Sequence, residues 1–145
     1  MKFLEKNLVL LDVPAASPEE AIRKAGQLLV DGNLAEQTYV EAMVESFKKN
    51  GPYFVLAPQI ALPHARPEDG VKEASVSFVR LENPVVFGNP ANDPVQLVFG
   101  LGASSSDEHL QILQKLMLLL GNPESVEKLK QVSTYEEINE LIGRN

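Results

Sequence analysis

The stretch ASVSFVRLENPVVFGNPANDPVQLVFGLGA, residues 74–103, decides the fold class of this sequence. Its apolar runs are short, rich in valine and phenylalanine, and separated by proline, glycine and asparagine, which is the pattern of β-strands joined by turns. We therefore expect strands at 74–81, 84–88 and 94–103. The alternation within VSFVRL predicts a half-exposed strand, whereas the continuous run PVQLVFGL predicts a strand buried on both faces.

The region that precedes this stretch predicts three short strands and two helices. The apolar runs at 8–13, 53–57 and 60–62 have the length and composition of strands. A helix is expected over 17–33, where a serine N-cap and a proline begin the pattern and Gly-Asn ends it. A second helix is expected over 36–51, which ends at Gly-Pro. The residues expected to face inward are Ala21, Ile22, Ala25, Leu28 and Leu29 in the first helix and Tyr39, Val40, Met43, Val44 and Phe47 in the second.

Helices return after the strand-rich stretch. We expect them at 107–121, at 123–132 and within TYEEINELIGRN (134–145), whose threonine and second glutamate have capping-box spacing. Helices first, strands in the middle and helices last are typical of an α/β fold with a mixed central β-sheet and helices packed on both faces. Because the sequence contains no internal repeat or long linker, we expect a single domain over 1–145.

The composition excludes several classes of protein. Of 145 residues, 44% are hydrophobic and 23% are charged, the balance of a soluble globular protein. No apolar run approaches the ~18 residues that span a membrane, and the N-terminus lacks a cleavage-site pattern, so a cytoplasmic protein is expected. Cysteine is absent, which excludes disulfides, thiolate metal sites and a cysteine nucleophile. The formal net charge of −7 argues against a nucleic-acid partner and is compatible with basic protein partners.

One of the two histidines, His64, follows an apolar strand and precedes a polar loop. Pro63 restricts the backbone at this point, and HARPEDG has the composition of a loop. A side chain at a strand end is anchored by the sheet and open to a partner, which is where reactive groups lie in α/β domains. The alternative is a surface histidine that titrates or forms a hydrogen bond without a chemical task.

The other histidine, His109, is expected in the first turn of a helix, because Ser105 and Glu108 have capping-box spacing. It shares a helical face with leucines four, seven and eleven residues further on, so it leans towards the protein body. The start of a helix binds anions, and its field lowers the pKa of a nearby histidine. A neutral imidazole there still donates one N–H. The alternative is a half-buried histidine satisfied by its own cap.

Together the two histidines predict a site that carries a phosphoryl group. A nucleophilic histidine needs one nitrogen with an exposed lone pair and its other N–H held, commonly by a backbone carbonyl. The phosphoryl group on that nitrogen would be dianionic and would need hydrogen-bond donors or a cation. The candidates for phosphoryl binding are His109, Arg66, Ser104, Ser105 and Ser106.

Four segments of the sequence resemble one known family. They are IALPHARPEDGV (60–71), PVVFG (84–88), DPVQLVFGLGA (93–103) and DEHLQILQKLMLLL (107–120). In this order, over nearly the whole chain, they resemble the enzyme IIA domains of the mannitol/fructose type, which belong to the bacterial phosphoenolpyruvate-dependent sugar phosphotransferase system. The segment YFVLAPQIALPHARPEDGV (53–71) is similar to the sequences of the ascorbate-specific branch of this family.

The resemblance implies a phosphotransferase that works as a relay. It implies that His64 accepts a phosphoryl group from the carrier HPr, on Nε2, and passes it to a cysteine of a cognate IIB component. His109 is implied to be the second active-site histidine, in contact with the phosphoryl group. A membrane IIC component would take part indirectly, since it selects the sugar. The implied fold is a mixed sheet with helices on both sides.

The sequence departs from the family pattern at one position. Mannitol-type members carry a phosphoryl-binding arginine near the end of the second helix, and alignment of YVEAMVESF places Ser46 there. Lys48, Lys49 or Arg66 are the cations that would compensate, unless this branch works without one.

Two other functions stay open. The first is a stand-alone regulatory IIA-like module that reports its phosphorylation state to another protein. The second is a metal site formed by His64 and His109 with Asp107 or Glu108. No paired-ligand spacing supports that site, so we expect neither a metal nor a cofactor.

Overall fold

A five-stranded mixed sheet forms the centre of the protein in the computed structural model, which describes residues 1–143. The strands are β1 (Lys2–Phe3), β2 (Val9–Val13), β3 (Ile60–Ala61), β4 (Ser75–Val85) and β5 (Val95–Gly102). β4 pairs in parallel with β1 and β2 on one side and antiparallel with β5 on the other. β3 is parallel to β5, and the site described below lies where the chain leaves β3.

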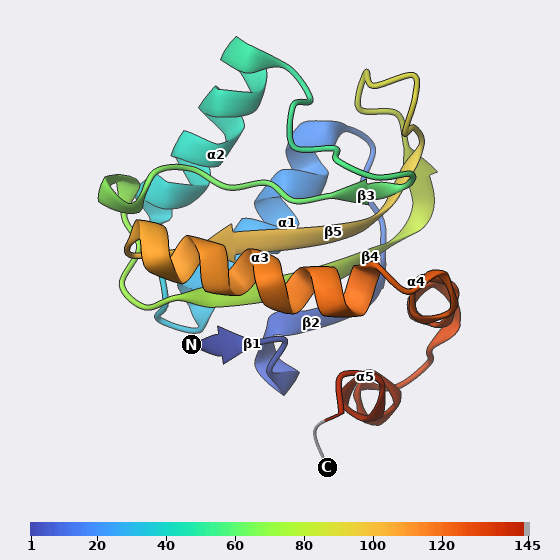
Figure 1. Ribbon diagram of the computed structural model, residues 1–145. Helices are drawn as coiled ribbons and strands as arrows, with labels where there is room; N and C mark the ends of the chain where they lie inside the picture. The colour runs from blue at the N-terminus through green and yellow to red at the C-terminus, as the bar shows by residue number, and fades with distance from the viewer. Residues whose placement is uncertain (144–145) are drawn as a thin grey trace.

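Helices cover both faces of this sheet, as Figure 1 shows. They are α1 (Pro18–Asp31), α2 (Gln37–Asn50), α3 (Ser106–Leu120), α4 (Pro123–Gln131) and α5 (Tyr135–Leu141), with two 3-10 turns at Lys6–Leu8 and Pro67–Asp69. α1 and α2 pack on one face, and α3, α4 and α5 pack on the other. The predicted fold class, a mixed sheet with helices on both faces, is confirmed. Within residues 1–143, no helix has both the length and the apolar character needed to cross a membrane.

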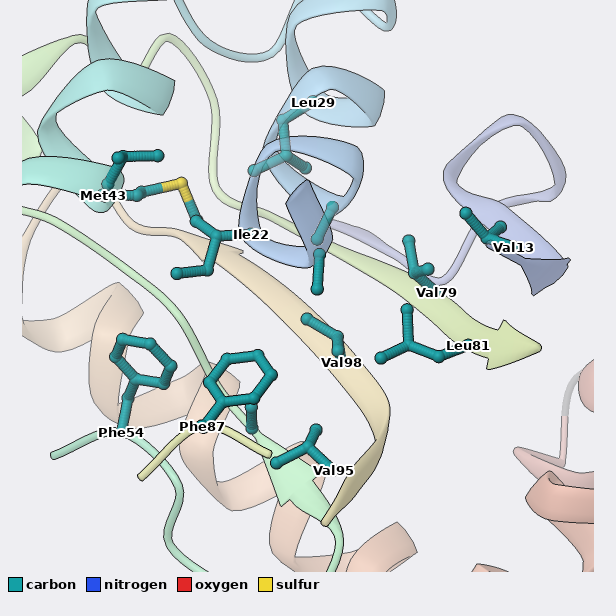
Figure 2. Close-up of a cluster of buried hydrophobic side chains, with 14 of the residues drawn as sticks. Val13, Ile22, Leu29, Met43, Phe54, Val79, Leu81, Phe87, Val95 and Val98 are labelled. Carbon is teal, nitrogen blue, oxygen red and sulfur yellow. The ribbon is translucent and has the colours of Figure 1, made fainter. Parts of the chain in front are cut away.

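Alternate side chains of β4 and β5 build a hydrophobic core on each face of the sheet. Val79 and Val98 are register partners and pack against Ile22 of α1 in the core drawn in Figure 2. Phe78 and Phe99 point to the opposite face, where their rings stack with centroids 4.8 Å apart beneath α3. β5 is therefore buried on both faces, as its continuous apolar run predicts.

The expectation of a half-exposed strand at VSFVRL is wrong, because Ser75–Leu81 is buried throughout. Two polar residues of this segment are buried with partners. Ser77 Oγ donates to the carbonyl oxygen of Ala25 in α1 at 2.7 Å. Arg80, only 5% exposed, pairs with Asp12 at 2.9 Å and donates to backbone carbonyl oxygens at the end of α4. Buried polar residues that have hydrogen-bond partners produce the same alternation of polar and apolar residues as a strand with one solvent-exposed face.

Two other strand predictions are also wrong. Residues 53–57 form a turn and a loop, and the carbonyl oxygen of Val55 accepts hydrogen bonds from asparagine side chains of the loop 89–92. The side chain of Val55 is buried, so the apolar composition of this segment reflects core packing rather than a strand. Residues 84–88 are not a separate strand, because β4 extends into them and a loop follows.

Three helices, α1, α3 and α5, begin at the caps predicted from the sequence. Ser17 Oγ accepts from the Glu20 N–H at 3.2 Å, and Thr134 and Glu137 form the reciprocal capping box. α5 ends at Leu141, and residues 144 and 145 of the expected helical segment lie outside the described residues. β1 was not predicted, because a strand of two residues leaves no periodic pattern.

Candidate active site

His64 lies where the chain leaves the sheet after β3. The N–H of Leu101 in β5 donates to the Pro63 carbonyl oxygen at 3.0 Å, which extends the β3–β5 pairing to the residue before the histidine. Leu62 N–H donates to the Phe54 carbonyl oxygen at 3.0 Å on the other side. The backbone is thus fixed up to Pro63, and the His64 side chain is half-buried at the surface.

The imidazole of His64 has one nitrogen held and one free. Nδ1 lies 2.8 Å from the carbonyl oxygen of Leu62. Because a carbonyl oxygen only accepts, Nδ1 carries the proton, and the lone pair is on Nε2. This is the arrangement that a nucleophilic histidine requires: the hydrogen bond fixes the tautomer and the ring orientation.

Tyr39 of α2 holds the backbone on the other side of His64. Its hydroxyl accepts from the Ala65 N–H at 3.1 Å and donates to the carbonyl oxygen of Leu101 in β5. Burial raises the pKa of the Tyr39 hydroxyl to about 12, so it stays a neutral donor. We expected Tyr39 only as a core residue. A tyrosine on the buried face of a helix needs a hydrogen-bond partner, and that requirement was the available signal.

His109 lies in the first turn of α3, with its ring beside that of His64. Ser105 is the N-cap as predicted, since its Oγ accepts from the Glu108 N–H at 3.2 Å. The two imidazole centroids are 5.4 Å apart, with an angle of 52° between the ring planes. Burial, and then the nearby His64, lower the pKa of His109, so its imidazole is neutral at pH 7. The direction agrees with the expectation from the helix field, although burial is the larger cause.

The predicted phosphoryl-binding serines do not all lie at the site. Ser105 and Ser106 line a surface hollow together with His64 and His109, which we call the His109 hollow. Ser104 does not line it, and its hydroxyl and N–H both donate to the carboxylate of Glu108.

The cations near His64 differ in whether they are already paired. Arg66 lines the His109 hollow, but its guanidinium pairs with Asp69 at 3.1 Å and lowers the pKa of that carboxyl. Lys48 pairs with Glu19 at 3.3 Å. Lys49 forms no ion pair with any of residues 1–143 and lines a second hollow beside His64. Of the three cations considered, Lys49 is therefore the one that lines a hollow with His64 and has no ion pair among the described residues.

This second hollow, which we call the Tyr53 hollow, is lined by His64 but not by His109. It is lined by residues of α2 and of the following turn, among them Glu45, Ser46, Lys49, Asn50 and Tyr53. Ser46, the residue at the family's arginine position, is hydrogen-bonded to the Tyr53 hydroxyl at 2.9 Å. Tyr53 was not a sequence candidate, because nothing in the sequence pairs it with His64.

The structure brings no metal-binding cluster together. Among residues 1–143 there is no group of three or more histidine, aspartate and glutamate side chains placed to hold a metal ion. Of the two acids considered as ligands, Glu108 accepts from Ser104 instead.

The titration of His109 should report on what His64 carries. We expect the ring of His109 to titrate with a midpoint below 6.5, because burial and His64 disfavour the imidazolium. A dianionic group on His64 should raise that midpoint, since it stabilises the imidazolium. Below pH 6.5 the unfolded chain protonates this imidazole more readily than the folded protein does. The free energy of unfolding therefore decreases as the pH falls from 6.5 through the lowered pKa of the folded protein.

NMR of the imidazole ring protons as a function of pH measures this midpoint directly. His64→Ala is the matched control, because burial alone should still hold the His109 midpoint below 6.5. A midpoint at or above 6.5 in the unmodified protein contradicts the lowered pKa of His109.

Comparisons with known proteins identify similar chains. A family model described as phosphoenolpyruvate-dependent sugar phosphotransferase system, EIIA 2, matches residues 2–145. The ascorbate-specific PTS system EIIA component of Escherichia coli K12 is 33% identical over 141 residues, which cover 97% of this chain and 92% of that protein. The structure of the mannitol-specific cryptic phosphotransferase enzyme IIA CmtB from Escherichia coli has a TM-score of 0.85 at 35% identity, covering 99% of this chain and 96% of that one. A complex of enzyme IIAMTL and phosphorylated enzyme IIBMTL, also from Escherichia coli, has a TM-score of 0.84 at 34% identity, with 97% of each chain covered.

Proposed function

We propose that this chain, which belongs to the EIIA type 2 family of the phosphoenolpyruvate-dependent sugar phosphotransferase system, relays a phosphoryl group through His64. Membership of that family makes the chain a phosphotransferase system protein. The observation that carries the proposal for His64 is the state of its ring. Nδ1–H is held by the Leu62 carbonyl, and Nε2 is free beside a second imidazole 5.4 Å away.

The proposed donor is the carrier HPr in its phosphohistidine form. The Nε2 lone pair of His64 forms a bond to phosphorus, while the N–P bond on HPr breaks and its electron pair returns to the HPr imidazole. Because the Leu62 carbonyl holds the Nδ1 proton, the ring keeps that proton when Nε2 bonds to phosphorus and so becomes positively charged. A protonated ring is the better leaving group for the next transfer.

The proposed acceptor is a cysteine of a cognate IIB component. Its thiolate attacks phosphorus, the Nε2–P bond breaks, and the electron pair returns to Nε2, which restores the neutral His64. A complex of enzyme IIAMTL with phosphorylated enzyme IIBMTL is among the structures similar to this chain, which supports a partner of that kind. In this scheme a membrane IIC component takes part only indirectly.

His109 and the start of α3 supply hydrogen bonds to the transferring group in this proposal. A neutral His109 donates one N–H, and Ser105 and Ser106 offer hydroxyls in the same hollow. Preorganised donors of this kind stabilise the charge that develops on the phosphoryl oxygens during transfer. Ser104 contributes only indirectly, through Glu108, and Arg66 would have to leave Asp69 to take part.

We infer that ascorbate is the sugar whose uptake this chain serves. The support is the likeness to the ascorbate-specific EIIA component over 97% of the chain. Gene neighbours that encode ascorbate-type IIB and IIC components would strengthen this assignment, and neighbours for another sugar would replace it.

Phosphorylation by purified general components tests the relay. Incubated with phosphoenolpyruvate, enzyme I and HPr, the protein should gain the mass of one phosphoryl group, and ³¹P NMR should show a phosphohistidine substituted at Nε2. Omission of HPr is the control and should leave the mass unchanged. A protein that gains no phosphoryl group under conditions that phosphorylate a known EIIA protein contradicts the proposal.

A further inference from the structure

Tyr53 contacts the reactive histidine directly. Its ring lies edge-on to the His64 imidazole, with centroids 5.9 Å apart and an angle of 80° between the planes. This is the T-shaped geometry in which two rings touch. The side chain is 43% exposed, so Tyr53 is not simply part of the core.

The Tyr53 hydroxyl is the end of a short hydrogen-bond chain that starts on α2. The Asn50 side-chain amide donates to Ser46 Oγ at 3.4 Å, and Ser46 Oγ lies 2.9 Å from the Tyr53 hydroxyl. An amide nitrogen only donates, so Ser46 accepts from Asn50, while either hydroxyl can be the donor between Ser46 and Tyr53. When Ser46 is the donor, the proton of the Tyr53 hydroxyl is free to point at another acceptor.

The charges around the Tyr53 hollow leave one cation, Lys49, and one anion, Glu45, without an ion pair among residues 1–143. Of the charged residues that line it, Arg66 and Asp69 neutralise each other at 3.1 Å. Glu45 and Lys49 also line it, and neither forms an ion pair with any other residue among 1–143. The hollow therefore offers a dianion on His64 one hydroxyl donor and one ammonium, and the Glu45 carboxylate is the one unpaired anion that lines it.

We propose that Tyr53 is a phosphoryl-contacting residue, whose hydroxyl donates to the group carried by His64, with Ser46 as its supporting donor and Lys49 as the accompanying cation. This inference rests on the proposed phosphorylation of His64. The phosphoryl group then lies between two sets of donors, His109 with the start of α3 and Tyr53 with the end of α2. No bond to Tyr53 forms or breaks during the transfer.

Tyr53→Phe is the decisive variant, because it keeps the ring contact with His64 and removes only the hydroxyl. It should still be phosphorylated on His64, but onward transfer to IIB should slow by about tenfold to a hundredfold, the usual cost of a hydrogen bond to a charged group. Ser46→Ala should cause a smaller loss, because the Tyr53 hydroxyl remains. Tyr135→Phe is the matched control. It removes a hydroxyl that donates to the Leu4 carbonyl oxygen at 2.9 Å, which joins α5 to the N-terminal segment, and should leave the rate unchanged.

A second readout separates contact with the phosphoryl group from a structural effect. A donor to a phosphoryl oxygen stabilises the dianion, so its removal should raise the pH at which the phosphoryl group of phosphorylated His64 takes up a proton in a ³¹P NMR titration. Lys49→Gln should move that titration in the same direction. Lys48→Gln is its matched control, because Lys48 is paired with Glu19, and should not move it.

The outcomes distinguish this inference from the proposed function. If the unsubstituted protein is not phosphorylated on His64, the proposed function fails and this inference fails with it. If the unsubstituted protein is phosphorylated but Tyr53→Phe transfers at the same rate with the same ³¹P titration, only the assignment of Tyr53 is overturned. Equal slowing in Tyr53→Phe and Tyr135→Phe also overturns it, because the effect would then be general.

Discussion

His64→Ala is expected to gain no phosphoryl group from phosphoenolpyruvate, enzyme I and HPr, a complete loss of the relay. His64 has the arrangement of a nucleophile, with Nδ1–H bonded to the Leu62 carbonyl at 2.8 Å and Nε2 free. The chain has only one other histidine and no cysteine, so no equivalent acceptor remains beyond His109. Intact mass after incubation measures the result, with the unsubstituted protein beside it.

The fold should survive this substitution. His64 is half-buried; its side chain makes one hydrogen bond, to a carbonyl of its own segment, and its ring lies beside those of Tyr53 and His109 at the surface. Loss of one such bond costs about 1 kcal/mol, a small part of a typical domain stability. Circular dichroism and thermal unfolding should therefore resemble those of the unsubstituted protein. A folded His64→Ala protein that still gains one acid-labile phosphoryl group means that the acceptor is another residue.

The sequence predicted those elements whose side chains follow local rules. α1, α3 and α5 begin at the serine and threonine caps read from the sequence, because an N-cap is satisfied within its own first turn. β5 was predicted as buried on both faces because its apolar run is continuous. The fold class followed from the order of these elements, which a single wrong strand does not change.

β4 shows why local pattern fails in a central strand. Arg80 is read as a residue facing water, but it is buried because Asp12 and the end of α4 supply its partners. Those partners lie 68 and 49 residues away in sequence, so no window around β4 contains them. Burial of a charged group depends on tertiary contacts, and a periodicity of two cannot distinguish it from exposure.

The same limit applies to the site. His64 and His109 could be singled out because each lies at the end of a predicted element, one a strand and the other a helix. Tyr39 could not, since its hydroxyl acts on Leu101, which is 62 residues away. The three cations considered as substitutes for the family's arginine are equivalent in the sequence. Only the ion pairs of Lys48 and Arg66 leave Lys49 as the one available.

His109→Ala is the second variant with a large expected effect, and it separates the roles of the two histidines. The His109 ring centroid lies 5.4 Å from that of His64 and burial lowers the pKa of His109, so in the proposed relay it is a neutral donor that stabilises the phosphoryl group without accepting it. The variant should still be phosphorylated on His64, while transfer to IIB slows. Removal of one preorganised donor to a developing oxyanion costs on the order of 10²–10³ in rate, and access of water to this surface site should place the effect towards the lower end.

The rate of transfer from the phosphorylated variant to IIB, followed by rapid quench, measures this effect, and two comparisons sharpen it. His109→Gln should recover part of the rate, because its amide also offers an N–H donor. α3 should remain folded in both variants, since the cap of α3 is Ser105, which is unchanged. Transfer at the unsubstituted rate in His109→Ala would make His109 a structural residue. If His109→Ala cannot be phosphorylated while His64→Ala can, the two roles are reversed. Phosphorylation requires the residue that accepts the phosphoryl group, so the variant that cannot be phosphorylated identifies the acceptor.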